Sequence, residues 1–214
     1  MNEKRPCRSL GPPPERASDL DGFPRDTLDT ETDLWRVVRK GRGPWWFGSS
    51  MKGRFDLPEP HGTCYVAVDP LSALLETVGP ERRGGAVSAR FFEDRRIRRL
   101  HLPRSRSVAD LRSRKAVGYG VTAEIGTIVP YELPQSWARK LHEAGAEGLG
   151  YWLRHDPARS EGYSLFDRHG ERRHWKRGRE RAISRKLLRE LHEECGIEVL
   201  EIPRSDQLTV LDEE

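Results

Sequence analysis

Apolar and polar positions alternate over short stretches of this chain, and segments with helical spacing lie between them. Alternation and β-branched or aromatic residues predict strands over residues 34–38, 62–68, 86–92, 97–102, 148–153, 162–166 and 197–202. Helical spacing predicts helices over residues 70–78, 133–144 and 179–195. The first helix has clear ends, because Asp69 suits an N-cap, Pro70 suits the first position and Gly79 suits a stop.

The order of these elements predicts a single α+β domain over residues 32–203, with mixed sheets and flanking helices. Residues 1–31 are rich in proline and charge and poor in apolar side chains, so we expect a flexible leader. Residues 103–120 are rich in Arg and Ser and are predicted to form a loop with a short helix. Residues 204–214 are expected to form a C-terminal tail.

The composition narrows the class of protein. The chain has 214 residues, and its 38 Lys and Arg against 34 Asp and Glu give a net charge of +4, too small by itself to indicate nucleic-acid binding. Cys7, Cys64 and Cys195 lie far apart, which argues against a disulfide framework or a zinc motif. No run approaches the roughly 20 apolar residues of a membrane span, and no signal-peptide pattern is present. We therefore expect a cytoplasmic protein that does not enter membranes.

Four polar side chains stand in segments that are otherwise typical of a protein interior. Arg36 interrupts the first apolar strand, and Arg54 precedes a phenylalanine. Tyr65 lies within the second strand, and Glu76 lies in the first helix. Charged side chains are rarely buried unless they are paired. These positions predict a polar cleft that binds an anion.

The same four residues have the chemistry of a dinucleotide site. Guanidinium groups such as those of Arg36 and Arg54 bind diphosphates with two charge-assisted hydrogen bonds. The ring of Tyr65 could stack on a flat heterocycle, and the carboxylate of Glu76 could stabilise an oxocarbenium-like ribose. Together they suit NAD and cleavage of its nicotinamide–ribose bond. The alternative is a structural ion pair of Glu76 with Arg54 or Arg36 beside a core tyrosine, and the residues alone leave both open.

The motifs around these residues resemble a known family, the RES domain, which is named for an Arg, a Glu and a Ser. The matching segments follow one another over residues 33–202 as WRV, GRFD, GTCYVA, DPLSALLETVG, PQSWARKLHEAGAEGLGYWLRH and SLFD. The resemblance implies a fold similar to that of ADP-ribosyltransferases and a bacterial toxin that degrades NAD or transfers ADP-ribose. It also implies an antitoxin partner with an Xre-type helix-turn-helix, and an oligomer formed with that antitoxin.

Carried over by this resemblance, the family's functional residues fall on Arg36, Arg54, Tyr65 and Glu76. The two arginines would anchor the pyrophosphate and ribose of NAD, and Tyr65 would pack on the nicotinamide side. Glu76 would stabilise the ribosyl cation or activate the acceptor, so Glu76 and Arg36 are the implied catalytic residues. The acceptor could be water, phosphate or a protein side chain.

One position departs from the family pattern. The family serine is expected in a Tyr-x-Ser-Arg segment, and Leu153 stands at its place. Losing one neutral hydrogen bond costs about 0.5–1.5 kcal/mol, and Ser160 or Ser164 could replace the hydroxyl in space. The alternative function is therefore a catalytically weakened RES-fold protein that acts as a protein-binding module.

Two other features have simpler explanations. Residues 171–189 are basic and contain Trp175, a composition that can bind nucleic acid. Several glutamates and the helical spacing favour a solvated helix face, so nucleic acid is not predicted as a partner. His192 and Cys195 lie three positions apart, but without a second pair of ligands they predict no metal site.

Overall fold

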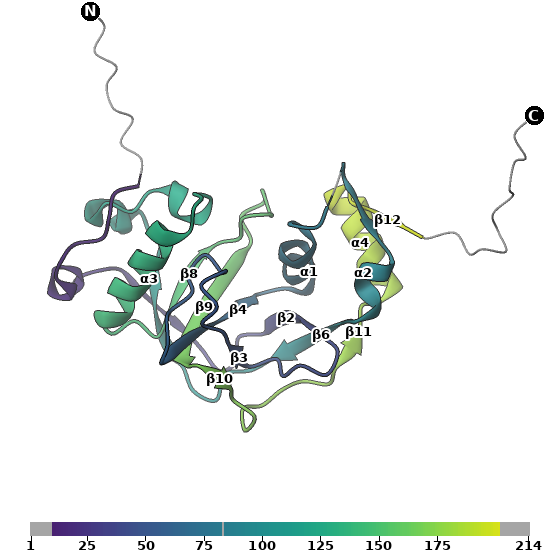
Figure 1. Cartoon of the computed structure of the whole chain (residues 1–214), viewed down its shortest axis with the longest axis horizontal. Coiled ribbons are helices and arrows are strands. Elements are labelled where there is room, and N and C mark those ends of the chain that lie inside the picture. Colours follow the sequence, from purple (N-terminus) through teal and green to yellow (C-terminus); the bar gives the residue numbers. More distant parts are fainter. Residues whose placement is uncertain (1–9, 83, 202–214) are drawn as a thin grey trace, which may run out of the picture.

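An eight-stranded mixed sheet runs through the molecule (Figure 1). The structure is a computed structural model, and it describes residues 10–82 and 84–201. The strand order is β1-β7-β8-β9-β4-β2-β6-β11. In this order the strands span Arg25–Leu28, Arg106–Asp110, Gly148–Trp152, Glu161–Arg168, His61–Ala67, Leu34–Arg39, Arg95–Leu100 and Arg181–Ala182. β7 and β8 are parallel, and the other neighbours are antiparallel.

Two small sheets and several helices complete the fold. β3 (Trp46–Phe47) pairs with β10 (Gly170–Glu171), and β5 (Ala86–Ser88) pairs in parallel with β12 (Glu198–Leu200). The α-helices are α1 (Pro70–Val78), α2 (Arg90–Glu93), α3 (Glu132–Glu143) and α4 (Arg185–Cys195). Single 3-10 turns lie at Ala17–Leu20, Arg114–Tyr119 and Ala123–Gly126. The predicted α+β domain with mixed sheets and flanking helices is confirmed.

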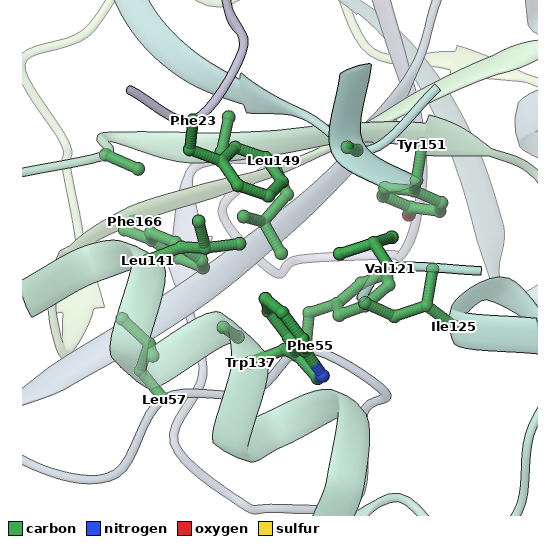
Figure 2. Packing of buried hydrophobic residues seen from close by; sticks show 14 of the residues in the cluster. Phe23, Phe55, Leu57, Val121, Ile125, Trp137, Leu141, Leu149, Tyr151 and Phe166 are labelled. Carbon is green, nitrogen blue, oxygen red and sulfur yellow. The ribbon is translucent and has the colours of Figure 1, made fainter. Parts of the chain in front are cut away.

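Three clusters of buried apolar side chains surround the main sheet. The first packs between the sheet and α3 and includes Phe55, Trp137 and Leu149 (Figure 2). The second lies on the opposite face, where Trp45, Phe47 and Trp175 gather. The third joins α1 and α4 to β6, with Leu74, Leu191 and Ile97 among its members. Both faces of the sheet are therefore covered.

Strand β4 contributes to two of these clusters because its side chains alternate between faces. Cys64 and Val66 point into the second cluster. Ala67 belongs to the first cluster, and Tyr65 packs against it. The sequence pattern of β4 thus places the Tyr65 ring on the face of the sheet that carries α3.

Helix α1 begins and ends where the sequence predicted. Asp69 Oδ1 accepts a hydrogen bond from the Ser72 backbone N–H at 2.8 Å, which is an N-cap interaction, and Pro70 is the first helical residue. The helix ends at Val78. Its apolar side packs into the third cluster, while Glu76, in the last turn, lies outside that cluster.

The N-terminal segment differs from the flexible leader predicted for residues 1–31. Leu10, Leu20 and Phe23 are at most 3% exposed and pack into the first cluster. Residues 25–28 form β1, which pairs with β7. The prediction is wrong for residues 10–31 because the segment has few large apolar side chains, but Leu10, Leu20, Phe23 and Leu28 are all buried. Residues 1–9 of the predicted leader and the predicted tail over residues 204–214 lie outside the described residues.

Other predicted elements changed in extent. The Arg/Ser-rich segment over 103–120 contains strand β7, whose Arg106 is buried and paired with Asp167 and Glu147. The predicted helix over 179–195 begins only at Arg185, because Ser184 caps it through the Leu187 N–H at 3.1 Å. The strand predicted over 86–92 ends at Ser88 and is followed by α2.

The main sheet opens between β2 and β4. These strands share one register pair, Trp35 with Ala67, whereas β4 pairs with β9 from His61 to Ala67. Since the two backbones separate beyond that pair, side chains from both strands can face a common space. This opening positions the candidate site.

Candidate active site

A cavity of about 360 Å³ lies at the opening between β2 and β4. Arg36, Arg54, Tyr65 and Glu76 all line it, although they come from β2, a loop, β4 and α1. The four predicted residues therefore meet at one site. The rest of the wall comes from segments distant in sequence and includes Tyr131, Tyr151, Leu153, Arg154 and His155.

Arg54 is a buried cation in this wall. It is 8% exposed, and within the described part of the chain no carboxylate forms an ion pair with it. Nη1 donates to the Ile128 carbonyl at 2.6 Å, and the guanidinium lies 4.7 Å from the centre of the Tyr131 ring. Nη2 is buried without a hydrogen-bond partner, and burial lowers the pKa of Arg54. A buried guanidinium with a free donor is suited to binding an anion.

The loop that carries Arg54 is fastened to β4 by Tyr65 and Asp56. The Tyr65 hydroxyl donates to Asp56 Oδ1 at 2.9 Å and accepts from the Phe55 N–H at 2.8 Å. Asp56 also accepts from the Gly53 N–H at 2.9 Å. Burial raises the pKa of Tyr65 well above its usual value, so the hydroxyl keeps its proton. Tyr65 thus lines the cavity, and it also fixes the backbone on both sides of Arg54.

Helix α3 holds the same loop from the other direction. Gln135 is buried, and its Nε2 donates to the carbonyls of Met51 and Gly53 at 2.9 and 2.8 Å. Met51 has a positive φ of 58°, an uncommon backbone conformation for a side chain of this size. The bonds from Gln135 stabilise this turn. Sequence reasoning missed Asp56 and Gln135, because neither has a local pattern that separates it from a surface residue.

Glu76 places a free carboxylate at the cavity. Its Oε1 accepts from the His155 backbone N–H at 2.6 Å. Burial raises the pKa of Glu76, and the His155 N–H and the charges of Arg54 and Arg154 partly offset that rise. Among the described residues, neither Arg36 nor Arg54 forms an ion pair with Glu76. The structure therefore contradicts the alternative in which these residues form a structural ion pair.

Arg36 stands between this cavity and a neighbouring hollow of about 530 Å³, and it lines both. Its Nη1 donates to the carbonyls of Pro44 and Trp46 at 2.6 and 3.0 Å and contacts Cys64 Sγ at 2.8 Å. Protein atoms thus occupy one nitrogen of the guanidinium, which leaves Nε and Nη2 as its donors to a ligand. Arg36 also holds the segment that leads into β3.

His155 is a wall residue that the sequence did not single out. Its ring lies against Gly79, where a Cβ would come within 2.3 Å of it, so the glycine after α1 leaves room for the imidazole. Burial and the nearby charges of Arg154 and Arg82 lower the pKa of His155, which favours the neutral ring at pH 7. The signal for His155 was its place at the end of the matching segment that contains Leu153.

Leu153 occupies the wall at the position of the family serine. It is 5% exposed and packs close to Gly162, where a Cβ would lie 2.2 Å from Leu153 Cδ2. Ser164 is fully buried in β9 opposite Tyr65, and Ser160 lines a different hollow. No described serine lines the cavity, so neither Ser160 nor Ser164 replaces the missing hydroxyl; the hydroxyl of Thr77, which does line it, donates to the Ala73 carbonyl at 2.8 Å.

Family comparison identifies the domain. A model described as the RES domain matches residues 33–186. The chain belongs to the RES domain family. The match contains all four predicted site residues, so the cavity described above lies within the RES domain.

A solved structure has a fold similar to this RES domain. A chain in the crystal structure of the M. tuberculosis MbcT-MbcA toxin-antitoxin complex superposes with a TM-score of 0.59 at 14% sequence identity. The similarity covers 77% of this chain and 91% of that chain. At this identity the comparison establishes the shared fold. No curated protein sequence matches the chain.

Proposed function

We propose that this RES domain binds NAD and cleaves its nicotinamide–ribose bond. The observation that carries the proposal is the meeting of Arg54 and Glu76 in one cavity, each without an ion-pair partner among residues 10–82 and 84–201. A guanidinium fork suits a pyrophosphate, and the rings of Tyr65, Tyr131 and Tyr151 offer flat surfaces for a heterocycle. The cavity volume falls within the range of about 300–1,000 Å³ typical of small-molecule sites.

Cleavage would break the bond between N1 of nicotinamide and C1′ of the ribose. The bonding electron pair leaves with nicotinamide, which departs as a neutral ring, and positive charge develops on the ribose. The carboxylate of Glu76 would stabilise this charge in a site from which most water is excluded. An acceptor oxygen then bonds to C1′ and loses its proton. The acceptor is water, phosphate or a protein side chain.

An antitoxin partner belongs to this proposal. The structural neighbour comes from a toxin-antitoxin complex, and a protein that consumes NAD would harm its own cell without a neutralising partner. We propose an antitoxin with an Xre-type helix-turn-helix that forms an oligomer with this chain. A gene for such a protein beside this one would support the proposal.

The proposed location is the cytoplasm, where an NAD-consuming toxin meets its substrate. Among the described residues, no helix has the length and apolar character needed to cross a membrane.

The decisive experiment measures nicotinamide release from NAD by the purified protein. Glu76→Gln removes the negative charge with little change in size, so we expect release to fall about 100-fold or more while NAD still binds. Glu81→Gln is the matched control, since Glu81 is exposed just beyond the same helix, and it should match the parent. If Glu76→Gln releases nicotinamide as fast as the parent, the assignment of Glu76 is wrong. Runs with and without phosphate would identify the acceptor class.

Leu153 is the observation that favours the alternative function, a catalytically weakened RES-fold protein that binds a protein partner. NAD binding without any nicotinamide release would support this alternative. Absence of both binding and release would leave only the family and the fold. Calorimetric titration with NAD separates these outcomes, and Arg54→Ala should abolish the titration signal, because it removes the buried cation.

A further inference from the structure

Basic side chains gather at one end of the main sheet. We define the basic face as residues 36–46, 95–99 and 171–181. These segments lie side by side, because β2 pairs with β6 and the segment after β10 contacts both neighbours. In that segment, the Gly178 N–H donates to the Arg99 carbonyl at 2.9 Å, and the Arg172 N–H donates to the Trp45 carbonyl at 3.0 Å. β2, β6 and β11 lie side by side in Figure 1, on the side of the molecule away from α3.

The charge of this face is far larger than the net charge of the chain. The face holds fourteen Lys and Arg residues against Glu171 and Glu180, and Asp33 and Asp94 lie at its border. The whole chain has 38 basic and 34 acidic residues. The remainder therefore has 24 basic and 32 acidic residues, so it is net negative. Although the net charge of the chain is only +4, positive charge is concentrated in the basic face and the rest of the chain is negative.

Ion pairs neutralise only part of the face. Glu180 pairs with Arg96 and Arg98, and Glu171 lies 3.5 and 3.7 Å from Arg173 and Arg177. The pairs of Glu171 leave Arg173 and Arg177 accessible, with side chains 86% and 49% exposed, whereas Arg96 and Arg98 are largely buried beside Glu180. Other exposed cations of the face form no ion pair within the described residues: Lys40, Arg42, Lys176, Arg179 and Arg181.

An exposed aromatic ring lies within the same face. Trp46 is 44% exposed and borders the hollow of about 530 Å³ together with Arg39 and Arg42. Its ring is held edge-on against His169, with centroids 5.4 Å apart. By contrast Trp175, the aromatic that the sequence placed in the basic segment, is 7% exposed in the second cluster. The accessible ring thus comes from β3.

We propose that the basic face binds single-stranded nucleic acid, with its arginines along the phosphate backbone and a base stacked on Trp46. Non-specific binding of single strands combines a cationic groove with aromatic rings, and both are present here. The sequence favoured a solvated helix face for residues 171–189, because it could not show that residues 171–181 leave the helix and join two other basic segments. Of the cations of the face, Arg36 alone also lines the proposed NAD cavity, so the proposal does not depend on NAD cleavage.

The test uses fluorescein-labelled single-stranded DNA and RNA of mixed sequence, about 16 nucleotides long, in a fluorescence anisotropy titration. The variant Arg42→Glu/Arg173→Glu/Arg179→Glu reverses three exposed charges of the face. The matched control Arg114→Glu/Lys115→Glu/Arg139→Glu reverses three exposed charges near and on α3. We expect the parent and the control to bind in a salt-dependent manner and the face variant to bind at least tenfold more weakly.

Two further measurements make the proposal specific. Trp46→Ala should weaken single-strand binding about fivefold or more, since it removes the stacking ring. Nicotinamide release by the face variant should match that of the parent, which separates this test from that of the proposed function. Equal losses in the face variant and the control, or no binding at low salt, would overturn the proposal. The proposal would also be overturned if a poly-glutamate peptide competed for the face as well as unlabelled single strands do and Trp46→Ala had no effect. That result would indicate an acidic protein partner.

Discussion

The carboxyl group of Glu76 lies where burial opposes its ionisation, which raises its pKa above the usual 4.5. The proposed chemistry needs the ionised form. As the pH falls through this raised pKa, the group takes up a proton and the rate should fall with it. We therefore predict that the acid limb of kcat/KM for nicotinamide release lies at a higher pH than an exposed glutamate would give. A rate that stays constant down to pH 4.5 would contradict this role.

Leu153 offers a second prediction for a single residue. Leu153→Ser restores the hydroxyl expected by the family pattern at a position that lines the cavity. One neutral hydrogen bond contributes about 0.5–1.5 kcal/mol, so kcat/KM for NAD should rise about two- to tenfold. Leu153→Ala removes the same bulk without adding a hydroxyl and serves as the control. If both variants change the rate equally, the effect comes from space and not from the hydroxyl.

The residues of the site differ in how far the sequence could predict them. Arg36, Arg54 and Glu76 could be found because a charge in an apolar segment is unusual, and the cavity brings them together. Tyr131 and His155 could not be found in this way. They reach the cavity from segments distant in sequence, and an aromatic residue in a loop has no pattern that indicates where it points.

At the scale of elements, the loop before β4 is a preformed support for Arg54. Tyr65→Phe keeps the ring in the cavity wall but removes the hydroxyl that bonds Asp56 and Phe55. We predict a fall in NAD affinity of about tenfold. Hydrogen bonds to charged groups contribute about 1.5–3 kcal/mol, and losing those of the Tyr65 hydroxyl leaves the Arg54 loop less well fixed for binding. Calorimetry measures the affinity, and hydrogen exchange over residues 51–56 should become faster.

Tyr119→Phe is the control for this loop, since Tyr119 lies outside the cavity and loses the same hydroxyl. Unchanged NAD affinity in Tyr65→Phe, with unchanged exchange, would show that the loop is held by other bonds. A lower affinity without faster exchange would assign the Tyr65 hydroxyl a direct contact with the ligand. The two readouts therefore separate positioning from binding.

Some boundaries of helices and strands could be predicted from the sequence, and others could not. α1 was predictable because its cap and its stop are local signals. The start of α4 was not, because Arg, Glu and Ala before it are good helix formers, although Arg181 and Ala182 form the short strand β11. β7 could not be predicted because it is polar: its buried Arg106 pairs with the carboxylates of Asp167, in β9, and Glu147, just before β8.

At the scale of the molecule, the N-terminal segment belongs to the first cluster of buried side chains. Leu20, the last residue of the 3-10 turn Ala17–Leu20, is fully buried in the first cluster, so Leu20→Ala should lower the free energy of unfolding by about 2–5 kcal/mol. Val117→Ala is the control, because Val117 is 67% exposed and should change the free energy of unfolding by less than about 0.5 kcal/mol. Urea denaturation measures both. If the Leu20→Ala protein is as stable as the parent, the N-terminal segment does not stabilise the fold, and the prediction of a flexible leader is supported.

Because the sheet opens between β2 and β4, the two sides of the cavity pack against different clusters of buried side chains, the first and the third. Arg54 and Tyr65 lie on the side of the first cluster, while Glu76 lies on α1 beside the third. A ligand that touches both sides ties the two clusters together and stabilises the folded protein in proportion to the logarithm of its concentration. On the proposed function that ligand is the substrate. If the protein consumes NAD, it would lower the concentration of its own stabilising ligand, and the folded protein would become less stable as NAD is depleted.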